Sequence, residues 1–243
     1  MPTINASNTG NTDDVFLSRF AESSWANARD ATSANDSSDS AASSSWFTRS
    51  YHTVNPRTGA TVYGVRRSFM AFDTSSITAN VAEAFLSVRG VSTNDGSVIA
   101  VKSDAYGGDG GSNWGTSDFN NIVGWSAGSS LDGLATVYGA ANTTTNWVTN
   151  NWNEFTATGD LLRDMKNNDI VIVCLMNYTN DYLNVEPSEG DDLRCGGYYG
   201  EHTYRPHIDY TLGYNNKANG VTATSISKVS GVASTSIQKV NGV

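Results

Sequence analysis

The pentapeptide Gly124-Trp125-Ser126-Ala127-Gly128 has the Gly-x-Ser-x-Gly pattern of a nucleophile elbow, in which a serine hydroxyl attacks an acyl carbon. Acidic residues and then His202 or His207 follow it in the hydrolase order Ser, Asp, His. An elbow needs a buried strand before the serine and a helix after it. The preceding apolar segment is short, and a Ser/Gly-rich segment follows. We therefore expect Ser126 to lie in a loop and the chain not to be an enzyme, with a serine hydrolase kept as the third hypothesis.

Acidic residues gather between positions 180 and 192, where Asp181, Glu186 and Asp191 are candidate ligands for Ca²⁺. Hard cations take several oxygen ligands at once, although this spacing departs from the EF-hand loop. A solvated acidic loop explains the same composition. The three His and two Cys show no zinc-binding spacing. No cofactor is expected, and a structural Ca²⁺ stays open.

Aromatic side chains inside segments rich in Gly, Asn and Asp suit sugar binding. A pyranose stacks its apolar side on an exposed ring, while amides and carboxylates bind its hydroxyl groups. The alternative is that these rings close the ends of a β-sandwich core. The glycan-binding candidates are Tyr106, Trp114, Trp125, Tyr198 and Tyr199.

Charge divides the 243-residue chain into two parts. Residues 214–243 hold Lys217, Lys228 and Lys239 and no acidic residue, so their net charge is +3. Because the whole chain carries a net charge of −9, residues 1–213 carry −12. An anionic body repels phosphate groups, so neither nucleic acid nor an anionic membrane is an expected partner. No apolar stretch approaches the ~18 residues of a membrane span, and the first residues lack the features of a secretory leader.

The predicted elements of the body are almost all strands. The run 170–176 is continuously apolar, which predicts a central strand covered on both faces. Cys174 lies in this run, so we expect a buried reduced thiol, while one disulfide with Cys195 stays possible. Strands are also predicted over 14–20, 46–47, 61–73 with a bend at Gly64, 82–91, 97–101, 151–158 and 204–212.

The connections between these strands are of three kinds. Asn94-Asp95-Gly96 is typical of a hairpin turn, here joining the strands at 82–91 and 97–101. Residues 159–166 predict a helix of about two turns, capped by Asp160. Segment 23–45 has little to bury and is predicted as a long surface loop. Segment 104–121 is rich in Gly, Asn, Asp and Ser with three embedded aromatic residues, and is predicted as a functional loop or an irregular crossover.

These elements predict an all-β fold, an antiparallel jelly-roll β-sandwich with one short helix and an extended C-terminal repeat tail. We divide the chain into a sandwich domain over 1–213 and a tail over 214–243. The segments 67–77, 84–88 and 204–210 resemble landmarks of the DNRLRE domains, jelly rolls related to carbohydrate-binding modules. The tail, residues 219–243, resembles tails on virion proteins of tailed bacteriophages and on bacterial surface proteins. The resemblance implies a particle-borne or cell-surface jelly roll that binds glycans.

The tail repeats with a period of eleven residues. Asn219-Gly220-Val221, Ser230-Gly231-Val232 and Asn241-Gly242-Val243 are evenly spaced, and Ser-Ile-Ser-Lys-Val at 225–229 returns as Ser-Ile-Gln-Lys-Val at 236–240. Each unit has too little apolar area to offset its ordering entropy, so it must pack on another surface. The predicted attachment residues are Ile226, Lys228, Val229, Val232, Ile237, Lys239, Val240 and Val243.

Three functional hypotheses follow. The first is a non-enzymatic structural protein on a particle surface, such as a phage virion decoration or fibre protein, attached or oligomerised through its tail. Its expected partners are other protein subunits, with a homo-oligomer and a virion or extracellular location. The second is a glycan-binding module that contacts cell-surface sugars, and the third is the serine hydrolase.

Overall fold

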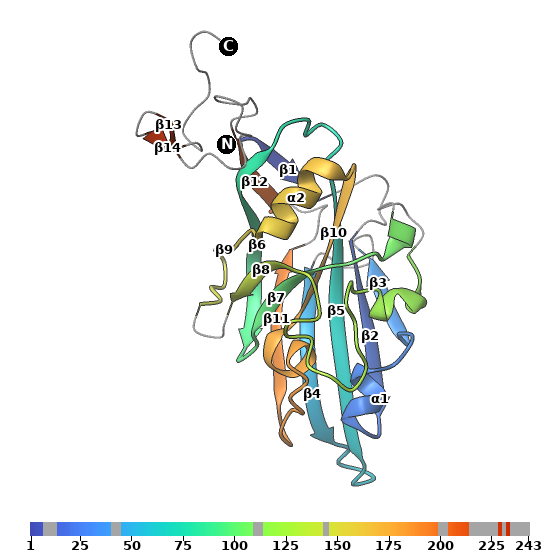
Figure 1. The fold of residues 1–243 in the computed structure, drawn as a ribbon. Helices are drawn as coiled ribbons and strands as arrows, with labels where there is room; N and C mark the ends of the chain where they lie inside the picture. The colour runs from blue at the N-terminus through green and yellow to red at the C-terminus, as the bar shows by residue number, and fades with distance from the viewer. Residues whose placement is uncertain are drawn as a thin grey trace.

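The computed structural model describes residues 1–6, 14–39, 45–108, 114–142, 146–198, 204–213, 228–229 and 232–233. The fold is mostly β and antiparallel, as the sequence predicts, and it curls into a jelly-roll-like sandwich (Figure 1). Its strands are β1 (Thr3–Asn5), β2 (Asp14–Glu22), β3 (Asp36–Asp39), β4 (Ser45–Val54), β5 (Thr61–Asp73), β6 (Val81–Asn94), β7 (Val98–Lys102), β8 (Val137–Asn142), β9 (Trp152–Thr156), β10 (Ile170–Asn177), β11 (Asp192–Tyr198), β12 (His207–Leu212), β13 (Lys228–Val229) and β14 (Val232–Ala233).

The helices of the described chain are short. The α-helices are α1 (Trp25–Arg29) and α2 (Gly159–Asn167). Three short helices of other types are also described: η1 (Tyr106–Gly108) after β7, η2 (Thr116–Asn120) before β8, and η3 (Tyr178–Tyr182) after β10. Neither α1 nor α2, nor any other helix in the described ranges, is long and apolar enough to cross a membrane.

One 12-stranded sheet forms the body, in the order β1-β12-β6-β11-β4-β5-β10-β7-β8. Off this path, β2 pairs with β5, β3 pairs with β2, and β9 pairs with β6. Single bridges join its ends to other parts of the sheet. Ala6 bridges Phe72 of β5, and Gly139 of β8 bridges Ala157 just after β9. These bridges curl the sheet and cover parts of its edges.

The central strands β5 and β10 are buried on both faces. Met70 and Val173 face the inner core, which β6, β9, β12 and α2 cover. Phe69 and Cys174 face an outer core, closed by α1, η1, η2 and the segment around Leu131. The predicted strand at 170–176, buried on both faces, is confirmed. Burial of both faces explains why its sequence is continuously apolar and does not alternate with polar residues. Cys174 and Cys195 are both buried and free, as expected for Cys174.

The helix predicted at 159–166 is present as α2, but its capping residue differs from the prediction. The Thr158 hydroxyl accepts a hydrogen bond from the Leu161 amide, so Thr158 is the N-cap and Asp160 lies in the first turn. There its carboxylate interacts favourably with the positive end of the helix dipole.

The segment 23–45 is not the long surface loop that its polar composition predicts. It contains α1 and the edge strand β3. The Ser24 hydroxyl accepts a hydrogen bond from the Asn27 amide and starts α1, which buries Trp25, Ala28 and Arg29. A single Trp within a polar run gives too weak a periodic signal to reveal a helix of five residues.

The predicted hairpin at Asn94-Asp95-Gly96 is also wrong. β6 pairs with β9, β11 and β12, whereas β7 pairs with β8 and β10. The turn is a corner where the chain leaves one part of the sheet for another. Asp95 has φ 47°, and a Cβ on Gly96 would lie 2.4 Å from the Arg194 carbonyl carbon, so close backbone approach explains the glycine.

The described part of the tail forms a sheet of its own. Lys228 pairs with Ala233 and Val229 with Val232, as strands β13 and β14, apart from the 12-stranded sheet. The other predicted attachment residues, Ile226, Ile237, Lys239, Val240 and Val243, lie outside the described residues.

Candidate functional site

Arg67, on β5, lies at the centre of a buried polar network. Its side chain and that of Asp181 in η3 are both 0% exposed and form a two-point ion pair, Nε to Oδ2 at 2.8 Å and Nη2 to Oδ1 at 2.7 Å. The same guanidinium donates to the carbonyls of Phe119 (2.7 Å) and Arg29 (2.9 Å) and to the Asn120 side chain (2.5 Å). One side chain of the sheet therefore holds three separate loop segments.

Arg29 extends this network towards α1. Its Nε donates to the Asp181 carbonyl (2.7 Å) and its Nη2 to the Ser129 carbonyl (2.7 Å), while Nη1 pairs with Asp30 at 2.6 Å. Burial lowers the pKa of Arg29 from its ordinary value, and nearby Arg67 adds to this, while Asp181 and Asp30 oppose it. The carboxylates keep both guanidinium groups neutralised in the core.

Trp125 lies between the two guanidinium groups. Arg67 is 4.2 Å and Arg29 4.7 Å from the centre of its rings, and Arg67 is also 4.1 Å from the Phe119 ring. Desolvated cation–π contacts of this kind are worth about 2 kcal/mol each. The ring that the sequence offers as a sugar platform is thus engaged in holding the loop layer together.

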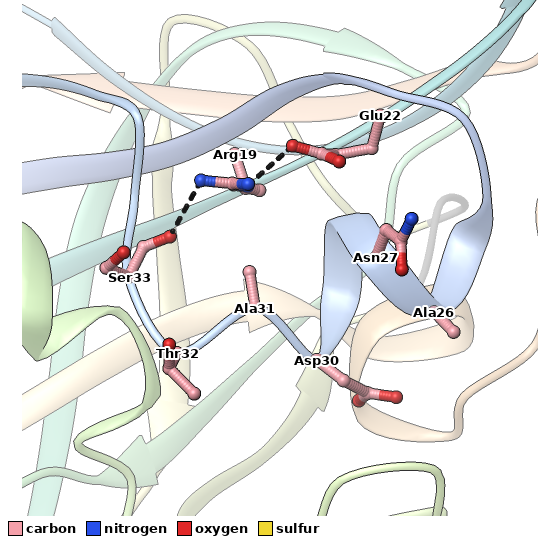
Figure 2. Close-up of a pocket in the computed structure, with 8 residues that line it drawn as sticks. All are labelled: Arg19, Glu22, Ala26, Asn27, Asp30, Ala31, Thr32 and Ser33. Atoms are coloured by element: carbon pink, nitrogen blue, oxygen red, sulfur yellow. Dashed lines mark hydrogen bonds and ion pairs between the residues drawn. The ribbon is translucent and has the colours of Figure 1, made fainter.

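A hollow of about 520 Å³ opens beside this network. The end of β2, one side of α1 and residues 30–33 enclose it (Figure 2). Its size suits a small ligand. The lining residues are Arg19, Glu22, Ala26, Asn27, Asp30, Ala31, Thr32 and Ser33.

The charged groups of this hollow, which we call the α1 hollow, are already neutralised. Arg19 pairs with Glu22 at 2.7 Å on the β2 side of the hollow (Figure 2). The Asp30 carboxylate accepts from Arg29 at 2.6 Å and from the Gly128 amide at 2.9 Å. The walls thus present donors and acceptors of both kinds with little net charge, and the exposed side chains of Asn27 and Thr32 add an amide and a hydroxyl.

The predicted glycan-binding aromatics do not form one surface. Tyr106 is 0% exposed in the outer core and its hydroxyl donates to the Phe69 carbonyl, so the expectation for this ring is wrong. Trp114 is half-buried against the same core. Tyr198 is half-buried at the other side of the sheet, with its ring 5.5 Å from that of Tyr204. Tyr199 lies outside the described residues.

Ser126 lies in a loop, as predicted. Gly124 before it has φ 87°, and a Cβ there would lie 2.1 Å from the Leu134 carbonyl oxygen. The residues around it form turns, with a single bridge at Ile122 in place of a strand and no helix over 124–130. The strand-to-helix geometry of a nucleophile elbow is therefore not formed at this serine.

The three candidate Ca²⁺ ligands serve separate structural contacts. Asp181 is in the ion pair with Arg67. Glu186 accepts a 2.5 Å hydrogen bond from the Tyr63 hydroxyl, and this bond, together with burial, raises the pKa of Tyr63 to about 12. Asp191 accepts from the Ser188 amide. The described ranges hold no group of three or more His, Cys, Asp or Glu side chains with metal-site geometry.

A second hollow, of about 580 Å³, lies where β7, β8 and the start of β10 meet. Within its wall, Lys102 (2.7 Å) and the Tyr138 hydroxyl (2.8 Å) both donate to Asp164 Oδ2. Burial opposes ionisation of Asp164, yet these two donors and the charges of Lys102 and Arg163 outweigh it and hold its pKa below the usual range. Because every member has a partner, this cluster reads as a structural link between α2 and the sheet.

No protein-family model matches this chain, and no curated protein matches its sequence. Its function is therefore inferred from its own residues and their geometry. The α1 hollow is the feature that sequence reasoning missed, because its residues fall in a segment predicted to be a loop. The spacing of Trp25, Ala28 and Arg29 behind Ser24 is the signal that indicates a helix there.

Proposed function

We propose that this protein is a non-enzymatic structural protein of a particle or cell surface, joined to neighbouring subunits through its C-terminal repeats. The observation that carries the proposal is the eleven-residue repeat of residues 219–243. Its described strands pair only with each other within the described part of the chain, and a sheet of two short strands is marginal in water. Such a segment gains stability by packing on another surface.

The body is arranged to be displayed from one end. The Tyr210 amide donates to the Pro2 carbonyl, so the start of the chain and the strand that leads into the tail lie together. Helix α1, which lines the α1 hollow, lies towards the opposite end of the sandwich (Figure 1). Attachment beside β12 therefore leaves the α1 hollow facing outward.

Deleting residues 214–243 is the first test. We expect the truncated body to keep its melting temperature, because both cores lie within residues 1–213, and to become a monomer where the full chain is an oligomer. Sedimentation equilibrium of both proteins measures this. A full chain that is already monomeric, or a truncated body that stays oligomeric, contradicts the proposal.

A second function, binding of a neutral saccharide, is favoured by the lining of the α1 hollow. Sugars present many hydroxyl groups and no charge, so they suit a site rich in both donors and acceptors whose ion pairs are internally satisfied. An anionic ligand would have to compete with Glu22 and Asp30 for Arg19 and Arg29, which are already paired with them. Ala26 and Ala31 supply small apolar contacts for the ring carbons.

For this second function, Asn27→Ala and Thr32→Ala are each expected to weaken saccharide binding about tenfold, equivalent to about 1.4 kcal/mol. Asn167→Ala is the matched control, since Asn167 is also an exposed Asn on a short helix but lies in α2. A glycan array identifies the ligand and calorimetry then measures its affinity. Binding that is absent from the array, or equally strong in all variants, removes this function.

A further inference from the structure

Among the described strands, β1, β3, β8 and β9 each pair with a single other strand, and of these four only β3 has no isolated bridge in it or directly next to it. Strand β3 pairs with β2 alone, and it lies beside β2 at the margin of the sheet (Figure 1). The other ends of the sheet are tied back by the bridges at Ala6 and Gly139. Alternate residues of β3 direct their backbone N–H and C=O groups away from β2, which makes β3 a template for another strand.

The composition of β3 selects what can pair with it. Its sequence is Asp36-Ser37-Ser38-Asp39, with a carboxylate at each end and no apolar side chain, and Asp36 is exposed. Charged edges prevent two identical edges from pairing, because like charges directly opposite are destabilising. A basic strand would have the opposite effect, because its lysine would be attracted to the acidic edge.

The tail sequence contains two short basic segments of about the length of β3. Ser225–Val229 and Ser236–Val240 each place one Lys among β-favouring Ile and Val, and residues 214–243 contain no acid. The described piece of the first unit, Lys228–Val229, already has strand conformation in β13. We propose that the β3 edge of one molecule binds a repeat strand from the tail of a second copy of this chain.

The number of units favours a second copy. One chain has a single β3 edge but two Ser-Ile-x-Lys-Val segments, so each tail has one segment more than the β3 edge of its own body can accept. The second segment is then available to another molecule. This inference names the partner in the assembly of the proposed function, and it rests on that function.

Charge reversal at the edge tests the inference. We expect Asp36→Lys combined with Asp39→Lys to weaken self-association at least tenfold. Lys228→Glu combined with Lys239→Glu should do the same, and the two pairs together should restore most of the affinity. Asp132→Lys with Asp169→Lys is the control, because it changes the net charge equally at two exposed acids elsewhere. Sedimentation velocity over a concentration series gives the dissociation constants.

A mixing experiment distinguishes binding between two molecules from binding of a tail to the β3 edge of its own molecule. A tail-deleted body supplies only the edge, and a full chain with Asp36→Lys and Asp39→Lys supplies only the tail, so we expect these two to bind each other. No binding between them overturns the inference. If tail deletion abolishes association while the reversed edge associates like the parent, the proposed function stands and the β3 inference fails. If tail deletion changes nothing, both fail.

Discussion

Arg67→Met is expected to lower the free energy of unfolding by about 3–5 kcal/mol, the usual cost of removing one partner of a buried ion pair. Met fills most of the same volume, so the change isolates the lost charge from the lost packing. It leaves the fully buried Asp181 carboxylate with only the more distant Arg29, whose Nε lies 3.7 Å from Oδ1. The carbonyls of Phe119 and Arg29 also lose their donor.

Urea unfolding followed by circular dichroism measures this change, with linear extrapolation to water. Arg163→Met is the control, since Arg163 also pairs with aspartates but is 58% exposed, and we expect no measurable loss of stability there. A loss below about 1 kcal/mol for Arg67→Met would show that the network is a minor contributor.

Arg67→Met is also expected to affect the α1 hollow, although Arg67 does not line it. Arg67 holds the Arg29 carbonyl at the end of α1, and Arg29 holds Asp30, which lines the hollow. Loss of Arg67 should therefore loosen α1 before it unfolds the sheet, because local regions open with their own free energies. Limited proteolysis near residues 25–35 reports this directly, as faster cleavage in the variant under native conditions.

The sheet was the more predictable half of this molecule. Strands such as 61–73 and 170–176 are long apolar runs, and a run of that kind has few alternatives to a buried strand. Strands β8 and β11 escaped prediction because Gly139, Gly196 and Gly197 interrupt them. Those glycines make room for rings: a Cβ on Gly139 would lie 2.6 Å from that of Phe155. This requirement for a glycine comes from the neighbouring strand, so the residues next to the glycine in the sequence show no pattern that predicts it.

The candidate sites depend on contacts between distant segments, so the sequence conveys them poorly. Arg67 reads as an ordinary strand residue until Asp181, 114 positions later, is placed against it. The aromatic candidates share the same difficulty, because exposed and buried rings occur in equally polar segments. Tyr106 is buried because Phe119, Ile122 and Leu131 pack with it in the outer core. The repeat of the tail, by contrast, is local and is visible without any structure.

Trp46 of β4, in the inner core, is the largest fully buried side chain of the described residues and is 0% exposed. Its rings meet those of Trp147 edge to face, with centres 6.0 Å apart and planes at 79°. Its Nε1 donates to the Tyr198 carbonyl at 3.1 Å, and Gly197 leaves the space that its rings occupy. The indole thereby joins β4 to β11 and to the segment before β9.

Trp46→Ala is expected to cost about 3–5 kcal/mol of unfolding free energy, because it empties a large buried volume and leaves the Tyr198 carbonyl without this donor. Trp46→Phe should cost less, since most of the apolar contact returns while the hydrogen bond does not. Trp152→Ala is the control: Trp152 is half-buried and meets His207 on the sheet surface, so we expect a loss of about 1 kcal/mol. Equal losses for Trp46→Ala and Trp152→Ala would place the stabilising core elsewhere, whereas the expected order assigns it to the closed interior of the curled sheet.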